Sequence, residues 1–310
     1  MRIGFEVFLV VCEEMSFSKA AQRLYITQQT ASDHIKRLEK EFSVTLFERK
    51  PTLHLAPAGE VLLQNLRSLM IVENNMERTL SHYAKGEQGS FNVGISTSRA
   101  HIILPKILPA FQKEYPLVNI SFEERDTKVM EEELLQGKID LFLGINTDYN
   151  PEYLIETIAE DELLLVIHPN LLQEFFSQEE IDSFREGADL RHFTNVPFVF
   201  PNFRTGKVSH AIREHLKTTG VPLRVIYNIS DSKTQLELCS SALCAVLTPE
   251  MLLRNYQTIQ IGQNTATGLC VFPVKGLAKL RIDLVSHKLV HYPPYIDRFM
   301  ELFRVAVREI

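Results

Sequence analysis

Apolar residues recur at helical spacing in the N-terminal part of the chain. One face of a first helix carries Phe5, Phe8, Leu9 and Cys12. Ser18 is the expected N-cap of a second helix that runs through Leu24, and Ala20 and Ala21 are small enough for close packing within it. The pattern therefore predicts a first, amphipathic helix and a second, short helix that can pack closely.

A third helix is expected after Thr27, which suits the N-cap position. Its apolar stripe consists of Ala31, Ile35, Leu38 and Phe42. Because only Tyr25 and Ile26 separate the second helix from this cap, the two helices must cross steeply, as in a helix-turn-helix. The next stretch, VTLFERKPTLHLAP, alternates apolar and polar residues around Lys50 and Pro51, which is typical of a two-stranded wing.

Residues 57–85 form one long amphipathic pattern, and Pro57 suits the first turn of a helix. Its apolar side chains fall three or four residues apart: Leu62, Leu66, Leu69, Val72, Met76, Leu80 and Tyr83. A stripe this long needs a partner, and we expect a coiled-coil-like seam in a homodimer; the alternative is packing against the chain's own domain. The two glycines of KGEQG, residues 85–89, then mark a hinge.

From residue 90 onward, predicted strands and helices alternate. The first set has strands at 91–96, 118–124 and 139–145 and helices at 102–115 and 128–136. The second set has strands at 198–200, 223–227 and 243–247 and helices at 207–218 and 233–239. This rhythm predicts parallel, doubly wound sheets in two lobes with a cleft between them. A final helix at 294–308 is expected to close the first lobe, and the charged stretch 170–195 to form surface helices.

These patterns divide the chain into three parts. We predict a winged helix-turn-helix at 1–58, mostly α-helical with a small β wing, and a linker helix with its hinge at 59–88. An α/β domain follows at 89–310. Its first lobe is expected at about 90–164 and 268–310, and its second lobe at about 165–267.

Charge changes this picture little. The 310 residues carry a net charge of −6, from 33 basic and 39 acidic side chains, so no overall basic field attracts nucleic acid or membrane. Residues 1–60 hold eight basic and eight acidic side chains, which leaves the helix-turn-helix neutral. Binding to DNA must therefore depend on where individual cations lie.

The chemistry-bearing residues exclude several classes of protein. The four cysteines lack CxxC spacing, and the ten histidines lack ligand spacing, so we expect no disulfide framework and no metal site. The patterns GxGxxG, GxSxG, HExxH and the P-loop are missing, so we expect no cofactor and no enzyme activity. The lack of a signal peptide and of a long apolar run indicates a cytoplasmic protein, and it argues against a secreted solute-binding protein.

The start of the predicted third helix is rich in side chains that suit base edges and phosphates. They are Gln28, Gln29, Thr30, Ser32 and His34. Lys36, Arg37 and Lys40 follow on the same helix, and Arg49 and Lys50 lie in the wing, as candidates for phosphate contacts. The alternative is an ordinary solvated helix face, which these counts alone do not exclude.

The segment FLVVCEEMSFSKAAQRLYITQQTASDHIKRLEKEFSVTLFERKPTLHLAPAGEVLL, residues 8–63, resembles the N-terminal signature of LysR-type transcriptional regulators. The SFS-AA--L core, the I--LE pair, the LFER wing and the AG pair match in order and spacing. Three positions depart from the usual pattern: Gln29 replaces proline, Ser43 replaces glycine and Ala56 replaces threonine. The linker helix and the two-lobed domain, which resembles periplasmic binding proteins, extend the resemblance over essentially the whole chain.

The resemblance implies a cytoplasmic transcription factor that binds double-stranded DNA under the control of a small-molecule effector. It also implies a homodimer through the helix at 59–85, assembly into a tetramer, contact with RNA polymerase and no membrane partner. Its DNA-contacting positions correspond here to Thr27, Gln28, Gln29, Thr30, Ser32, His34, Arg37 and Arg49. Lys19 and Lys36 are further candidates for contact with DNA.

The effector site is expected where strands end and helices begin in the two lobes. In the first lobe ISTSRAH supplies Ser96, Thr97, Ser98 and Arg99; in the second lobe PNFRTGK supplies Phe203, Arg204 and Thr205, and ISDSKT supplies Ser230. Free backbone N–H groups at such a helix start suit a carboxylate or phosphate, and the two arginines favour an anionic effector. The alternatives are ordinary N-capping by one serine and surface salt bridges by the arginines.

Overall fold

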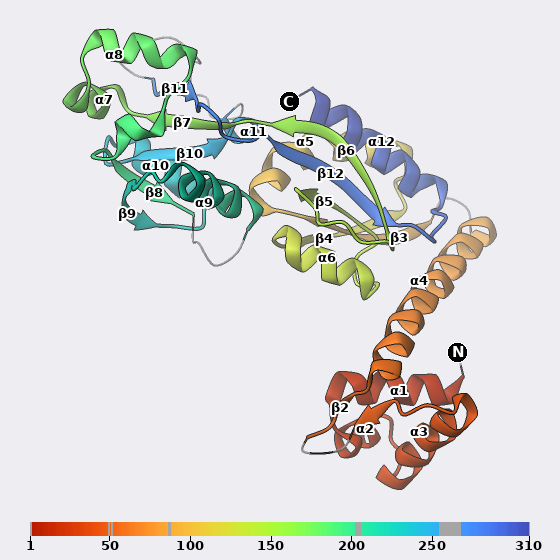
Figure 1. Ribbon diagram of the computed structural model, residues 1–310. Coiled ribbons are helices and arrows are strands. Elements are labelled where there is room, and N and C mark those ends of the chain that lie inside the picture. Colours follow the sequence, from red (N-terminus) through yellow and green to blue (C-terminus); the bar gives the residue numbers. More distant parts are fainter. Residues whose placement is uncertain are drawn as a thin grey trace. The chain divides into compact units, whose positions relative to one another are not determined.

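The computed structural model describes residues 2–48, 50, 52–85, 88–201, 206–253 and 268–309 (Figure 1). By the density of its internal contacts the chain divides into two compact units. One contains residues 1–77 with 135–137, and the other contains residues 78–134 and 138–310. None of the helices in the described ranges combines the length and the apolar character needed to span a bilayer.

The N-terminal unit is the predicted winged helix-turn-helix. Its elements are α1 (Ile3–Glu14), α2 (Phe17–Arg23), α3 (Gln28–Phe42), β1 (Phe47–Glu48) and β2 (His54–Leu55). The two short strands pair antiparallel and form the wing. The helices enclose a core that includes Phe8, Val11, Ala31, Ile35 and Leu38. Helical spacing predicted the three helices because each of them buries one stripe, and the alternation of apolar and polar residues predicted the wing.

Two local predictions in this unit are wrong. Ser16, not Ser18, caps α2, because the Ser16 hydroxyl accepts the Lys19 N–H at 3.3 Å while the Ser18 side chain turns toward α3. Phe42 is 45% exposed and does not join the buried stripe of α3, because it lies in the last turn, where its ring stacks on the half-buried Phe5 at the rim of the core.

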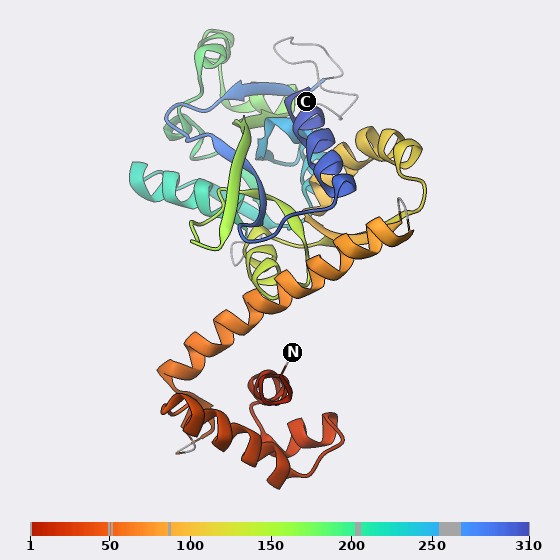
Figure 2. The same ribbon diagram turned by 90° about the vertical axis from the view of Figure 1, so that its right-hand side faces the viewer.

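The linker helix α4 runs without a break from Pro57 to Lys85 (Figure 2). Its apolar stripe divides into two parts. Leu62 and Leu66 pack into the core of the helix-turn-helix, with Leu66 only 1% exposed. Farther along, the side chains that remain exposed are Leu69, Val72, Met76 and Leu80. The Tyr83 side chain lies outside the described residues.

The larger unit contains, in its described residues, two five-stranded sheets, one in each lobe. The first sheet has the order β4-β3-β5-β12-β6, with β3 (Gly89–Ile95), β4 (Val118–Glu124), β5 (Leu141–Ile145), β6 (Tyr153–Asp161) and β12 (Leu280–His287). Its helices are α5 (Thr97–Glu114), α6 (Thr127–Leu135) and α12 (Pro294–Arg308). As predicted, α12 closes this lobe: the Phe299 ring lies edge-on to Phe91 and Phe111, with ring centroids 5.1 and 5.2 Å apart.

The second sheet has the order β11-β7-β10-β8-β9. Its strands are β7 (Leu163–Ile167), β8 (Pro197–Phe200), β9 (Arg224–Asn228), β10 (Ala245–Pro249) and β11 (Cys270–Pro273). The helices after its strands are α9 (Lys207–Thr219), α10 (Ser232–Ser240) and α11 (Glu250–Leu253). The stretch 170–195 is helical at the surface, with α7 (Pro169–Phe175), α8 (Gln178–Ser183) and the short 3₁₀ turns η1 (Phe184–Glu186) and η2 (Leu190–Phe193).

The parallel strands of both lobes agree with the predicted rhythm, but four strands were missed. They are β6, β7, β11 and β12, and all four pair antiparallel with at least one neighbour. Strands β6 and β7 adjoin where the chain crosses into the second lobe (Figure 1). Because β11 pairs with β7, the chain returns to the first lobe between residues 274 and 279, after the expected boundary at 268.

Candidate nucleic-acid interface and ligand cleft

The first turn of α3 is held by its cap. The Thr27 hydroxyl accepts the Thr30 N–H at 3.1 Å and lies 2.8 Å from the Thr30 hydroxyl. Ala31 and Ile35, both fully buried, anchor the opposite side of the helix in the core. The helix therefore presents the polar side chains of its first turns to solvent, as a helix that enters the major groove must.

The two glutamines at the start of α3 are oriented by neighbours. The Ser18 hydroxyl donates to Gln28 Oε1 at 3.0 Å, and Gln29 Nε2 donates to Asp33 Oδ1 at 2.9 Å. Each amide keeps further donor or acceptor positions, so both can still bond a base edge. Ser32 and His34 are partly exposed on the same helix.

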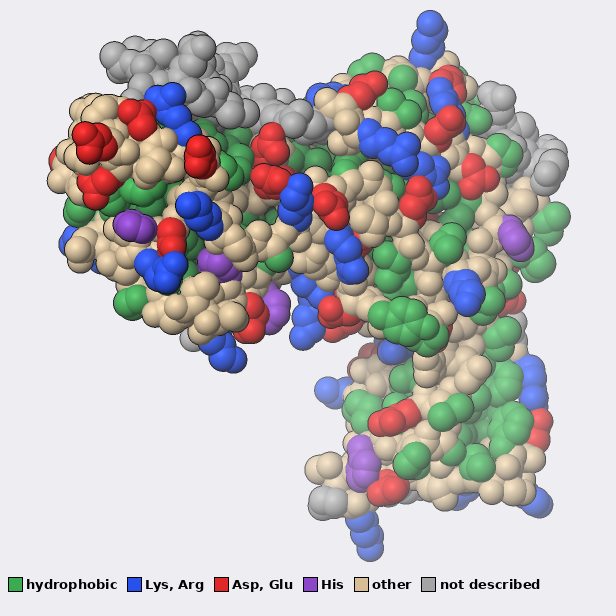
Figure 3. Space-filling view, turned by 45° about the horizontal axis from the view of Figure 1, so that its top comes forward, with side chains coloured by type: hydrophobic (Ala, Val, Ile, Leu, Met, Phe, Trp, Pro, Cys, Tyr) green, Lys and Arg blue, Asp and Glu red, His purple; other side chains and the backbone are tan. Residues whose placement is uncertain are grey.

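Cations without an ion pair among the described residues lie on α2 and α3. Lys19, Lys36 and Arg37 are exposed, and within the described residues none of them forms an ion pair. Arg2 and Arg23, by contrast, are each paired with glutamates of this unit. Figure 3 shows basic side chains projecting from the N-terminal unit, with acidic side chains among them, and a similar mixture on the visible face of the larger unit. Neutrality of the unit thus does not prevent a local positive surface.

Glu39 has a role that the sequence analysis did not predict. Its carboxylate on α3 accepts the backbone N–H groups of Leu46 and Phe47, at 2.9 and 3.3 Å, and so ties the wing to the helix. His54 on β2 links the two strands of the wing, because its Nε2 lies 3.0 Å from Oε2 of Glu48 on β1. Arg49, a predicted phosphate contact in the wing, lies outside the described residues.

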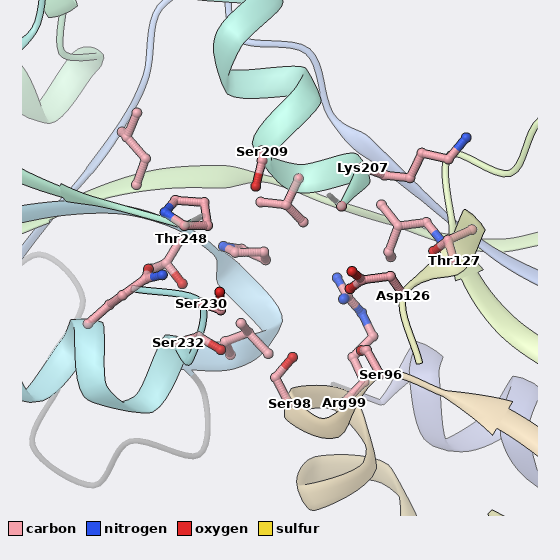
Figure 4. Close-up of a pocket in the computed structure, with 18 residues that line it drawn as sticks. Ser96, Ser98, Arg99, Asp126, Thr127, Lys207, Ser209, Ser230, Ser232 and Thr248 are labelled. Carbon is pink, nitrogen blue, oxygen red and sulfur yellow. The ribbon is translucent and has the colours of Figure 1, made fainter. Parts of the chain in front are cut away.

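The two lobes of the larger unit enclose a cleft of about 160 Å³ (Figure 4). It lies at the carboxyl ends of strands from both sheets, where ligands bind in open α/β folds. Of the predicted effector residues, the cleft is lined by Ser96, Ser98, Arg99 and Ser230. Thr97 is exposed and lines an adjoining groove instead. Phe203, Arg204 and Thr205 lie outside the described residues.

The first-lobe wall is rich in unused hydrogen-bond donors. Ser96 is the N-cap of α5, yet its side chain does not cap the helix, and within the described chain its buried hydroxyl has no partner. Arg99 is 3% exposed, and its Nε likewise has no partner among the described residues. Because the first N–H groups of a helix have no partner within the helix, this wall offers several donors to a bound anion.

Arg99 is also a structural residue. Its Nη2 lies 3.3 Å from Asp161 Oδ2, at the point where β6 ends and the chain crosses to the second lobe. The other Asp161 oxygen accepts the Met251 N–H at 3.1 Å. Burial lowers the pKa of Arg99 and raises the pKa of Asp161, and in both groups it outweighs the mutual attraction. The alternative of a surface salt bridge is thus correct for the pairing of Arg99 but wrong for its exposure, because the bridge is buried.

The second-lobe wall repeats this arrangement. Gly206 precedes α9 at φ +103°, a conformation that favours glycine, and it has no side chain to cap the helix. Thr248 lies at the end of β10, is 2% exposed, and in the part of the chain described here has no partner for its hydroxyl. Ser209, Ser230 and Ser232 bring further hydroxyls to the same wall.

Several cleft residues were missed from the sequence. They are Asp126, Thr127, Lys207, Ser209, Ser232, Gln235 and Thr248. Asp126, Thr127 and Thr248 lie at or just beyond the ends of β4 and β10, so the rule of carboxyl strand ends could have indicated them. Lys207 and Ser232 lie within the segments PNFRTGK and ISDSKT that the sequence had already indicated. The others depend on how the two lobes face each other, which no local pattern predicts.

Two family models together match most of the chain. Residues 4–60 match the bacterial regulatory helix-turn-helix protein of the lysR family, and residues 84–307 match the LysR substrate binding domain. The chain belongs to the LysR family. The winged unit and the two-lobed unit described above correspond to these two matches.

Relatives of this LysR-family chain include regulators from Bacillus subtilis (strain 168). It is 34% identical to the HTH-type transcriptional regulator AlsR over 181 residues, which are 57% of this chain and 60% of AlsR. It is also 34% identical to the HTH-type transcriptional regulator CysL over 166 residues, which are 52% of this chain and 54% of CysL. The chain thus spans between half and two thirds of the length of these curated relatives.

Solved structures share the fold of this LysR-family chain over nearly its whole length. Full-length CbnR complexed with its target DNA is 20% identical, with 98% of both chains covered and a TM-score of 0.56. Full-length BenM is 21% identical, with 100% of this chain and 98% of BenM covered and a TM-score of 0.56. At this identity the likeness concerns the fold.

The three departures from the usual LysR pattern each have a local structure here. Ser43 ends α3 in the left-handed conformation, at φ +55°, where glycine is favoured. Ala56 is buried, and its N–H donates to the Leu46 carbonyl at 2.9 Å. Gln29 lies in the first turn of α3, and its side chain bonds Asp33. None of the three interrupts the winged fold.

Proposed function

We propose that this LysR-family chain is a transcriptional regulator that binds double-stranded DNA and responds to a small anionic effector in the cleft between its lobes. One observation carries the DNA-binding part. A winged helix-turn-helix presents the polar first turns of α3 beside exposed cations, Lys19, Lys36 and Arg37, that have no carboxylate partner among the described residues. Such cations are available to phosphates without first breaking an ion pair.

The residues divide into two roles in this proposal. Thr27, Gln28, Gln29, Thr30, Ser32 and His34 contact base edges and nearby phosphates from α3. Lys19, Lys36, Arg37 and Arg49 contact the phosphate backbone. Base contacts determine which sequence is bound, whereas phosphate contacts determine how strongly binding depends on salt.

Footprinting on the DNA that flanks the gene tests this proposal. The chain should protect a two-fold symmetric sequence, and the log of affinity should fall linearly with the log of salt concentration. Lys36→Met should reduce that slope by about 1.8, because each of the two subunits on the two-fold site loses one phosphate contact worth about 0.9. Gln28→Ala should instead relax the preference at one base position and leave the slope unchanged.

The matched control is Arg23→Met, because Arg23 is already paired with Glu13 and Glu14. This change should leave the salt slope as it is in the parent. Protection that is absent, or that shows neither sequence preference nor salt dependence, would contradict the proposed DNA binding.

The effector part rests on unused donors on both walls of the cleft. Ser96, Arg99 and Thr248 each have a buried polar atom without a partner among the described residues, and neither α5 nor α9 is capped by a side chain. A buried group of this kind costs free energy unless a ligand bonds it. A volume of about 160 Å³ suits a molecule with one ring or a short chain. These features favour a small carboxylate.

A thermal-shift screen with acetate, benzoate and other small carboxylates tests the ligand class. A ligand at 100 times its dissociation constant adds about 2.7 kcal/mol to the free energy of unfolding. Thr248→Val and Ser98→Ala should each weaken that stabilisation and leave affinity for the DNA site unchanged. If a carboxylate stabilises the parent and both variants equally, the effector binds elsewhere.

The proposal also covers the oligomeric state of the protein and the division of the chain into domains. We infer a homodimer through α4, because Leu69, Val72, Met76 and Leu80 remain exposed along one long helix, and further assembly into a tetramer. We also propose the division into a DNA-binding domain at 1–58, a linker at 59–88 and an effector domain at 89–310. A cytoplasmic protein without catalytic activity, able to contact RNA polymerase, fits the same function.

A further inference from the structure

Lys207 joins the two lobes across the cleft. It is the first residue of α9 in the second lobe, and its Nζ lies 2.8 Å from Asp148 Oδ1 and 3.6 Å from Glu131 Oε1. Both carboxylates belong to the first lobe: Glu131 is on α6, and Asp148 follows β5. The Lys207 and Glu131 side chains are 16% and 10% exposed, whereas the Asp148 side chain is 76% exposed, so salt can screen the shorter of the two contacts.

The acceptor side of this contact is held in place. Glu131 Oε1, besides facing Lys207, accepts the Asp148 N–H at 2.9 Å. The Tyr153 hydroxyl, on β6, donates to the Glu131 carbonyl at 2.5 Å. The Glu131 side chain is 10% exposed. Because α6, the segment after β5 and β6 are bound together in this way, the first lobe holds the Glu131 carboxylate and the Asp148 backbone in place opposite Lys207.

Lys207 is poorly suited to bind the effector itself. It lines the cleft, but its side chain extends away from the hydroxyl groups of Ser98, Ser230 and Thr248 (Figure 4). Two carboxylates already exceed its single charge, so no net positive charge remains near its Nζ for an anion. Its partners indicate a contact between lobes rather than a contact with ligand.

We propose that Lys207 is a positioning residue that holds the two lobes in the arrangement of this structure, through its ion pairs with Asp148 and Glu131. The effect of this contact on the effector response rests on the proposed function. An effector that binds between the lobes shifts an equilibrium between open and closed arrangements. The ion pairs of Lys207 determine the fraction of closed molecules before the effector binds. The response then depends on residues that do not touch the effector.

Electron–electron distance measurements between spin labels on the two lobes test this inference on the full chain, without ligand and without DNA. Lys128→Cys on α6 and Lys217→Cys on α9 place labels at exposed positions of opposite lobes. Cys12→Ser removes the partly exposed native thiol, and the other native cysteines are buried. Mixing labelled with unlabelled chain suppresses distances between copies.

The parent should give a narrow distance distribution at low salt. Lys207→Met should broaden the distribution and shift it to longer distances. In the parent, 1 M salt should produce the same shift, because the screening length falls to about 3 Å. In Lys207→Met added salt should change nothing further, whereas Lys207→Arg, which keeps the charge, should retain the parental distribution.

Lys233→Met is the matched control. Lys233 lies in the first turn of α10 in the same lobe, and its charge acts on Asp231 of that lobe. Removing it should leave the distances and their salt dependence unchanged. The inference is overturned if Lys207→Met keeps the parental distances, or if Lys233→Met opens the lobes equally.

These outcomes are independent of the proposed function. The distance measurement uses neither effector nor DNA, so a failure to find a carboxylate ligand or a protected DNA site leaves its result intact. Asp148→Asn removes the same contact from the other lobe and should also lengthen the distance between the lobes. Combined with Lys207→Met it should add no further opening, since both changes remove the same contact. Additive opening would show that the two residues act separately.

Discussion

Replacing Arg99 by methionine should both destabilise the two-lobed unit and abolish its effector response. The Arg99 and Asp161 side chains are 4% and 2% exposed, so the change leaves a carboxylate buried without its cation. Removing one partner of a buried ion pair costs about 3–5 kcal/mol. We expect the lower end, about 3 kcal/mol, because the Met251 N–H still donates to Asp161. For a unit of this size that lowers Tm by about 6–12 °C.

The pH dependence identifies the cause. Burial raises the pKa of Asp161 even beside Arg99, and without Arg99 it must rise further. A carboxyl group whose pKa is higher in the folded than in the unfolded protein loses stability as pH rises from the unfolded value toward the folded value. The stability lost in Arg99→Met should therefore be larger at about pH 7.5 than at about pH 5.

Differential scanning calorimetry on the full chain measures this effect, since the two compact units can unfold in separate transitions. Arg99→Met combined with Asp161→Leu removes both charges and should recover most of the lost stability, because paired apolar replacements of a buried ion pair are often neutral. The double variant should still lack the effector response, which separates folding from ligand binding. An equal loss at both pH values, or no recovery in the double variant, would refute the buried-charge explanation.

Three further predictions concern the N-terminal half of the chain. Leu69→Lys together with Met76→Lys, at positions 58% and 53% exposed, should convert dimers to monomers in light scattering. Ser43→Gly should raise the free energy of unfolding of the winged unit by about 1 kcal/mol in urea titrations, because it relieves the left-handed C-cap. The pKa of His54 is raised by the Thr52 carbonyl and then by Glu48, so an NMR titration should place it above its ordinary value of about 6.5. The stability contributed by these His54 contacts is present below about pH 6.5 and is lost as pH rises through the raised pKa.

Each of these predictions has its own control. Asn74→Lys adds one lysine at an exposed polar position of α4 and should leave the dimer intact; an unchanged mass for the double lysine variant would exclude the seam. Ser32→Gly, inside α3, should destabilise the winged unit, so a similar loss in Ser43→Gly would show that the C-cap is not strained. Glu48→Gln should lower the pKa of His54 only in part, since the Thr52 hydrogen bond remains.

The dimer experiment differs from the one that the apolar stripe alone suggests. From spacing, Leu66 and Leu69 are equivalent seam positions. In the folded chain Leu66 is 1% exposed and packs into the helix-turn-helix core, so a lysine there would unfold the DNA-binding unit rather than test the seam. Periodicity shows which side of a helix is apolar, but it does not show which partner covers each part of that side.

The helices of this protein could be predicted where one buried face dictates a local pattern. Helix α12 begins and ends where predicted, and α3 begins at its Thr27 cap, because capping and helical spacing involve residues only a few positions apart. Strand β4 was also predicted with its bounds. The polar start of α3, with Gln28 and Gln29 as candidates for base contacts, followed from the same local information.

Tertiary structure alone decided the contacts between distant residues. Strand β12 pairs with β5 and β6, more than a hundred positions earlier, and no local pattern predicts such a partner. Its position after β3 made Arg99 a candidate for effector binding, but its pairing with Asp161 depends on where β6 ends. Lys207 reaches Asp148 and Glu131 only because the two lobes face each other. Local propensity therefore determined most helices, the parallel strands and the polar start of α3. The four antiparallel strands and the cleft arise from long-range packing, which brings separate strand ends together.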